Sequence, residues 1–285
     1  MKPAAHDVWL RGLFALAGRA PWTLAALRPA VVRAAPRIAP AVGRHTRANA
    51  RRIFDERPPG DFSCHVIGQF YDFVRDIGSA QHETAQQLCS HVVAVEGEPA
   101  YLATRAAGRG AVLVTAHMGS FEVGLAALRQ KEPCVHVVFK RDTFGGFESL
   151  RRRVRATLGV HEAAIDDGLP VLMRLRDALR DNGVVVMQGD RAMPGQKSAV
   201  VPFLKGHLRL PLGPLKLAEA AGSPVVPVFT VREGPGRFRV WLEPAIDPTS
   251  PHALRQLADT IARFVRRYPT QWLVLHKAFV EDETE

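Results

Sequence analysis

The chain has 285 residues, of which 47% are hydrophobic and 23% charged, so it is long and apolar enough to fold around a substantial core. No stretch reaches the roughly 18–20 uninterrupted apolar residues that a membrane-spanning helix needs. The formal net charge of +10 at pH 7 favours an anionic partner, which leaves a membrane surface, a phosphorylated lipid, an acidic carrier protein or a nucleic acid as candidates.

The first part of the chain, from about residue 8 to residue 77, has apolar residues at helical spacing. Arginines and prolines interrupt the apolar residues of the first 44 positions, and Trp9, Phe14 and Trp22 lie among them. This pattern suits either an amphipathic helix in the lipid interface or a helical layer packed on the core. We expect residues 1–60 to be a helical segment, for which both the interfacial and the packed interpretation stay open, and residues 61–285 to be an α/β domain.

From about residue 91, candidate strands and helices alternate along the chain. The strand candidates are VVAVEG, AVLVTAH, CVHVVFK, GVVVMQGD, SPVVPVFTVRE and GRFRVWLEPA, and helical patterns lie between most of them. Such alternation predicts an α/β fold with a mainly parallel central sheet flanked by helices.

Cysteine and histidine spacing gives no metal-binding motif. Cys64, Cys89 and Cys134 are far apart and read as reduced thiols of a cytoplasmic protein. The eleven histidines form no HxH or HExxH pattern. We therefore expect no metal and no cofactor.

The segment AVLVTAHMGSFEVGLAAL, residues 111–128, carries the clearest chemical signal. A buried strand ends at His117, Ser120 is a candidate N-cap, and Glu122 falls in the first turn of the next helix. An imidazole and a carboxylate in this arrangement can form a hydrogen-bonded pair that acts as a general base. The alternative is a buried histidine with a purely structural role.

Three strand ends are expected on one edge of the sheet, because sites in parallel sheets form at the carboxyl ends of strands. His117, the pair Lys140–Arg141 and the pair Asp190–Arg191 follow three of the predicted strands. The basic members suit an acidic carrier or a lipid phosphate. No GxSxG elbow, Walker loop or GxGxxG fingerprint is present, which disfavours a serine hydrolase or a nucleotide enzyme.

Several stretches, in order along the chain, resemble a known family. They are HTRANARRIF with Arg47 and Asn49, TAHMGSFEVG, VVVMQGDR, the segment from VPFLKG to PVVPVF, and YPTQWLVLHKAF. Together they resemble the lysophospholipid acyltransferase superfamily and, within it, the bacterial lipid A biosynthesis (lauroyl/myristoyl) acyltransferase branch. The motif of a histidine, four residues and an acid is the superfamily's signature, here in its HX4E form.

This resemblance implies roles for individual residues. His117 is expected to be the general base and Glu122 the acid that orients it. Arg155, with Arg153 as a competing choice, matches an arginine that follows the catalytic motif, and Asp190 matches a later acidic position that positions substrate or an arginine. Together with Ser120, Arg141 and Arg191, these residues are the predicted catalytic and substrate-binding set.

The expected reaction moves a fatty acyl chain from an acyl carrier protein or coenzyme A thioester to a hydroxyl of a lipid A precursor-like acceptor. A lysophospholipid, another glycolipid or a pigment headgroup stays open as the acceptor. The expected location is the cytoplasmic face of the bacterial inner membrane, with peripheral or weak attachment. A basic membrane- or nucleic-acid-binding protein is the non-enzymatic alternative, although no nucleic-acid-binding motif is present and nucleic acid is not expected as a partner.

Overall fold

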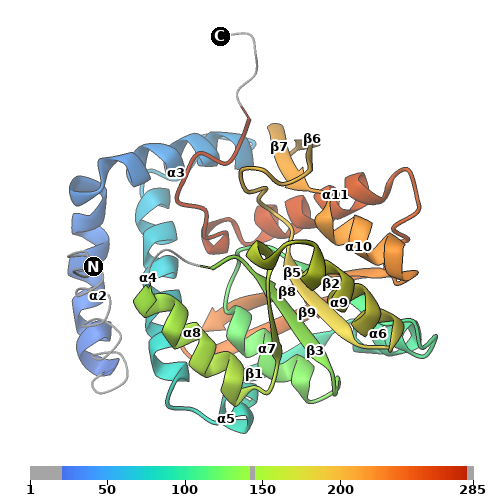
Figure 1. The fold of residues 1–285 in the computed structure, drawn as a ribbon. Helices are drawn as coiled ribbons and strands as arrows, with labels where there is room; N and C mark the ends of the chain where they lie inside the picture. Colours follow the sequence, from blue (N-terminus) through green and yellow to red (C-terminus); the bar gives the residue numbers. More distant parts are fainter. Residues whose placement is uncertain (1–20, 142–144, 281–285) are drawn as a thin grey trace.

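A seven-stranded sheet forms the centre of the molecule in the computed structural model, which describes residues 21–141 and 145–280 (Figure 1). The strand order is β1-β9-β8-β2-β5-β3-β4, and neighbouring strands are parallel except for β8 and β9. A separate antiparallel hairpin joins β6 and β7. The predicted α/β fold, with a mostly parallel sheet and N-terminal helices, is confirmed.

The strands have the following bounds: β1 Val92–Glu96, β2 Ala111–Thr115, β3 Val135–Phe139, β4 His161–Ala164, β5 Val184–Gln188, β6 Ser198–Phe203, β7 Gly206–Pro211, β8 Val225–Gly234 and β9 Arg237–Leu242. The helices are α2 Pro21–Ile38, α3 Pro40–Ile53, α4 Phe62–Ala80, α5 Ala85–Ser90, α6 Glu98–Arg105, α7 Phe121–Arg129, α8 Gly145–Thr157, α9 Leu169–Arg180, α10 Gly213–Ala221 and α11 Ala253–Arg267. Two 3-10 turns, Ile165–Asp167 and Pro269–Gln271, complete the described elements.

The core lies on both faces of the sheet. Every residue of β2, and all of β5 except its last, is buried, as their runs of apolar, mostly β-branched side chains require. One apolar cluster joins the sheet to α9, α10 and α11, and a second joins the other face to α5, α6, α7 and α8. The two layers of helices hold the carboxyl ends of β2 and β5 in place.

The N-terminal helices form a layer of their own, in which α2 packs against α4 (Figure 1). The Tyr71 hydroxyl donates to the carbonyl oxygen of Leu24 at 2.8 Å, and Arg28 pairs with Asp72 at 2.9 Å. The described part of this segment therefore packs on the rest of the protein, as one of the two interpretations predicted. Trp9 and Phe14 lie outside the described residues.

No helix in the described ranges combines the length and the apolar character that crossing a bilayer demands. The outer face of α2 is nevertheless apolar. Leu27, Val31 and Ile38 are 49%, 40% and 80% exposed, and their spacing of four and seven residues places them on one side of the helix.

Candidate active site

His117 lies two residues after the end of β2, in the loop that leads into α7. Gly119 in this loop has a φ of +59°, and a Cβ at that position would lie 1.7 Å from the carbonyl oxygen of Thr230 on β8. Only glycine fits there, because both the backbone conformation and the close approach exclude a side chain. The loop is thus pressed against the sheet, and His117 is fixed at the carboxyl edge of the strands.

Asp190 is the hydrogen-bond partner of His117. Its Oδ1 lies 2.7 Å from His117 Nδ1, and its Oδ2 accepts from the His117 backbone N–H at 3.0 Å and from Trp272 Nε1 at 2.9 Å. The Asp190 side chain is fully buried, whereas that of His117 is 25% exposed. The two residues meet because β2 and β5 are neighbouring parallel strands that both end at this edge.

The Asp190 carboxylate is ionised. Burial by itself would raise its pKa, but the charge of His117 and the hydrogen bonds from His117 and Trp272 outweigh burial and lower the pKa to about 2. An ionised carboxylate only accepts hydrogen bonds, so His117 Nδ1 must carry the proton. In the neutral imidazole the lone pair is then on Nε2, which has no hydrogen-bond partner among the described residues and is free to take a proton.

The predicted hydrogen bond between His117 and Glu122 is wrong. Glu122 is 1% exposed, and its Oε1 accepts from Arg151 Nε on α8 at 3.2 Å. The first turn of α7 turns this side chain toward α8 while the His117 ring is held by the end of β5. Glu122 Oε2 has no partner among the described residues, and the residue lines a cavity of about 210 Å³ whose wall includes Arg75, Asp76 and His91.

Ser120 occupies the predicted N-cap position of α7, with an extended backbone (φ −117°, ψ 107°). Its side chain makes no capping hydrogen bond, so only the position of the prediction is confirmed. The residue is buried beside Glu122, and both line the 210 Å³ cavity. The helix that starts here points its N-terminus, with its partial positive charge, toward the His117 loop.

The arginine that reaches the motif is Arg151. Arg155 is buried, donates from Nε to Glu162 at 2.5 Å, and lies over the ring of Phe139 at 4.3 Å from its centroid. Arg153 donates to Gln81 at 3.2 Å. The contact with Glu122 thus comes from Arg151, one turn before Arg155, and the predicted substrate-binding role of Arg155 stays a prediction.

The other two predicted basic residues differ in their surroundings. Arg141 forms a bidentate pair with Asp167 at 2.7 and 3.1 Å, which ties it to the turn after β4. Arg191 is exposed next to Asp190. Burial, Arg191 and then His117 lower the pKa of His276, which places Arg191 and His276 in the electrostatic environment of His117.

The C-terminal segment completes the site, which local sequence patterns did not indicate. Leu273 N donates to the His117 carbonyl at 2.8 Å, and Trp272 binds Asp190 as described above. Asn49 on α3 holds the same segment by donating to the His276 carbonyl at 2.8 Å and accepting from Ala278 N at 3.0 Å. The stretches HTRANARRIF and YPTQWLVLHKAF are thus joined in space, although 225 or more positions separate these contacts.

An apolar cavity of about 230 Å³ lies beside the His117 loop, between α7 and the sheet. Met118 and Phe121 from the loop and the start of α7 contribute to its wall. The remaining wall is largely apolar and includes Leu113, Leu125, Leu128, Val186, Val228, Val240 and Leu242. A cavity of this composition accommodates a hydrocarbon chain, and its wall reaches the residue that follows His117.

A family model and several known proteins match this chain. The model of a family described as "Bacterial lipid A biosynthesis acyltransferase" matches residues 69–281. A phosphatidylinositol mannoside acyltransferase of Mycobacterium tuberculosis (strain ATCC 25618 / H37Rv) is 29% identical over 251 residues, which cover 84% of this chain and 78% of that protein. The protein of the same name from Mycolicibacterium smegmatis is 31% identical over 185 residues, covering 62% and 59%.

Proposed function

Because the chain belongs to the bacterial lipid A biosynthesis acyltransferase family and is an acyltransferase family enzyme, we propose that it moves a fatty acyl chain from a thioester donor to a hydroxyl of a glycolipid. The observation that carries this proposal is the pair of His117 and Asp190 beside the apolar cavity. The donor is an acyl carrier protein or acyl-coenzyme A, whose thioester carbonyl is the electrophile.

His117 is the general base of the proposed reaction. Nε2 takes the proton of the acceptor hydroxyl while its oxygen attacks the thioester carbonyl, and the ionised Asp190 stabilises the imidazolium that forms. The tetrahedral intermediate expels the thiolate, which recovers the proton from His117. The first N–H groups of α7 lack intrahelical partners and suit the developing oxyanion.

The apolar cavity is the proposed site of the acyl chain. Met118 and Phe121 place its wall one residue after His117 and at the first residue of α7, so a chain inserted there presents its thioester to the histidine. Each buried methylene contributes about 0.8 kcal/mol to binding. The depth of the cavity therefore selects the length of the acyl chain.

Glu122 has a proposed positioning role that is exerted through Arg151. The ion pair holds the first turn of α7 to α8 and so fixes the helix N-terminus that faces the reaction. The exposed Arg191 is proposed to bind the acidic donor or a lipid phosphate. Arg155, paired with Glu162, supports α8 from within.

A phosphatidylinositol mannoside acceptor is favoured over a lipid A precursor by the relatives, which are named as phosphatidylinositol mannoside acyltransferases and align over 84% of this chain in one case. The test offers the purified protein a labelled acyl-coenzyme A with equal amounts of phosphatidylinositol mannoside and a lipid A precursor, and identifies the products by mass spectrometry. We expect acylated phosphatidylinositol mannoside. Acylation of the lipid A precursor alone would reject phosphatidylinositol mannoside as the acceptor, and no acylation of either lipid by this donor or an acyl carrier protein thioester would reject the proposed reaction.

Attachment to the membrane is proposed to be peripheral, on the cytoplasmic face, through the N-terminal helical segment of residues 1–60. Leu27, Val31 and Ile38 form the exposed apolar stripe of α2, and Arg33 and Arg37 are exposed on the same helix. An amphipathic helix with basic residues next to its apolar face binds anionic lipid surfaces. This geometry brings a lipid acceptor close to the protein.

A further inference from the structure

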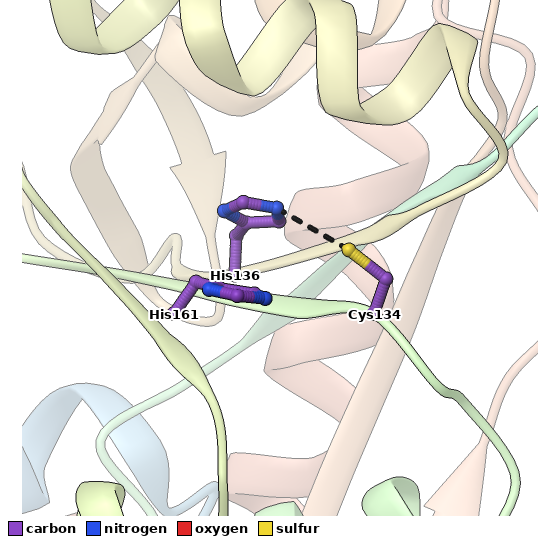
Figure 2. A group of neighbouring side chains, drawn as sticks. All are labelled: Cys134, His136 and His161. Carbon is purple, nitrogen blue, oxygen red and sulfur yellow. Dashed lines mark hydrogen bonds between the residues drawn. The ribbon is translucent and has the colours of Figure 1, made fainter.

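Three side chains with metal-binding atoms meet at the edge of the sheet where β3 and β4 begin. Cys134 immediately precedes β3, His136 is its second residue, and His161 is the first residue of β4. Figure 2 shows the three side chains gathered on the same side of these strands. Within the described part of the chain, this is the one cluster of three or more histidine, cysteine or acidic residues with the geometry to hold a metal ion.

The sheet itself creates this cluster. Side chains two residues apart on a strand point to the same face, so Cys134 and His136 lie side by side. Parallel pairing of β3 with β4 places His136 directly opposite His161, and their rings stack with centroids 4.7 Å apart. Two of the three side chains, those of His136 and His161, therefore come from strands, and the third, Cys134, comes from the residue just before β3.

The distances between the ligand atoms fit a small tetrahedral ion. Cys134 Sγ lies 3.5 Å from His136 Nε2, and one ligand atom from each of the three residues lies within 4.8 Å of the others (Figure 2). With bond lengths of about 2.3 Å to sulfur and about 2.0–2.1 Å to nitrogen, neighbouring ligands around zinc are about 3.3–3.6 Å apart. The sulfur–nitrogen pair already has this separation, and a modest rotation of the exposed His161 ring closes the rest.

We propose that Cys134, His136 and His161 bind a zinc ion, with a fourth position open to solvent. One thiolate and two imidazoles are borderline-soft donors that suit Zn²⁺ and do not suit Mg²⁺ or Ca²⁺, which take oxygen ligands. Cys134 and His136 are half-buried and His161 is exposed, so the ion can enter from solvent. This proposal departs from the sequence-based expectation of no metal, because a Cys-x-His pair completed by a histidine of the next strand matches none of the cysteine or histidine motifs on which that expectation rested.

The ion would have a structural role. β4 is the last strand of the sheet and has four residues, and a ligand from it and two from β3 would clip this edge strand to its neighbour. The three residues lie where β3 and β4 begin, whereas His117 follows the carboxyl end of the parallel strand β2. The metal site and the candidate active site are therefore at opposite ends of the strands. The positive charge of Arg174 on α9 acts on His136 and would repel a bound cation. A Cys134 thiolate formed on metal binding would offset this repulsion.

The test measures Zn²⁺ binding to the full, chelator-treated chain by isothermal titration and by metal analysis after gel filtration, and uses Co²⁺ as a spectroscopic probe. The variants are Cys134→Ser and His161→Ala, and the matched controls are Cys64→Ser on α4 and His252→Ala at the surface. His161 is exposed, so its variant is expected to fold even if Cys134→Ser does not. Circular dichroism checks the fold of each protein.

We expect one Zn²⁺ per chain with submicromolar affinity, a rise in thermal stability on binding, and a thiolate-to-cobalt charge-transfer band. Both site variants should weaken binding at least tenfold, because loss of groups that merely support metal ligands already costs about 10–100-fold. The controls should bind like the wild type. Absence of submicromolar binding, or equal binding by His161→Ala and the wild type, would overturn the proposal. Mg²⁺ should give no response.

Discussion

Replacement of Asp190 by asparagine tests how the proposed base is held. Asp190 Oδ2 accepts two N–H donors, from His117 N and Trp272 Nε1, and Oδ1 faces His117 Nδ1. An asparagine has one acceptor oxygen, which the two donors on the Oδ2 side will claim. Its amide N–H then points at Nδ1, which must accept, and the proton of the neutral imidazole moves to Nε2. The variant keeps the shape of the site and removes the lone pair that takes the proton.

The expected loss follows from this change of tautomer. General-base catalysis contributes about 10²–10⁴-fold to rate, and each tenfold corresponds to about 1.36 kcal/mol, so we expect the barrier to rise by about 3–5 kcal/mol. Stability should fall much less, because asparagine retains the acceptor for His117 N and Trp272. Alanine at this position would instead leave three N–H groups without their acceptor, at about 1–3 kcal/mol for each that stays buried and unsatisfied.

The assay compares kcat/KM for acyl transfer by Asp190→Asn and Glu122→Gln, with thermal unfolding as the control for folding. We expect the asparagine variant to lose at least about 10²-fold, mainly in kcat, and the glutamine variant to lose less, because Glu122 contacts Arg151 and not His117. Nearly normal activity of Asp190→Asn together with an inactive Glu122→Gln would refute this reasoning. Glu122 would then be the orienting acid after all.

Three further results are expected. Thermal stability of the wild type should fall as the pH drops from about 3.8 toward 2, because the pKa of Asp190 is lower in the folded protein than in the unfolded chain, so that its ionised form stabilises the fold at higher pH. Asp190→Asn should lack this pH dependence, and identical pH profiles of the two proteins would be contrary evidence. Val228→Phe, in the apolar cavity, should shift donor preference toward shorter acyl chains, by roughly fourfold in kcat/KM for each methylene excluded, whereas an unchanged chain-length profile would place the acyl chain elsewhere. Leu27→Glu with Val31→Glu should reduce cosedimentation with anionic vesicles while activity on detergent-dispersed substrate persists, and unaltered cosedimentation would show that α2 is not the membrane-facing element.

Much of the fold could be predicted because its strands have strong local patterns. The runs of valine in β2, β5 and β8 are typical of strands buried on both faces, and the structure places all three at the centre of the sheet. The strand β4, His161–Ala164, was missed because four residues with two polar ones at the sheet edge carry no periodicity. The hairpin of β6 and β7 was missed because the turn between them, at Leu204, has a φ of +51° without the usual Asn-Gly signal.

The site was predictable only in part. The strand-end rule placed His117 and Asp190 on one edge, but their hydrogen bond depends on β2 and β5 being neighbours, which the order of strands along the chain does not give. The hydrogen bond between His117 and Glu122 was predicted from sequence spacing alone. In the structure Glu122 contacts Arg151 on α8, and His117 is bound by Asp190 instead. Arg151 and Arg155 are four residues apart on one helix face, and Arg155 pairs with Glu162 on the unpredicted strand β4 while Arg151 contacts Glu122. Trp272 has no local signal at all.

The most direct test of the central claim is kcat/KM for transfer of a labelled acyl chain from acyl-coenzyme A or an acyl carrier protein to a glycolipid by His117→Ala, measured against the surface control His252→Ala. Both proteins should fold like the wild type, since the His117 side chain is 25% exposed and His252 is at the surface. If His117 is the base, its variant loses at least about 10²-fold while the control keeps wild-type activity. Retention of acyl transfer by folded His117→Ala would contradict the account.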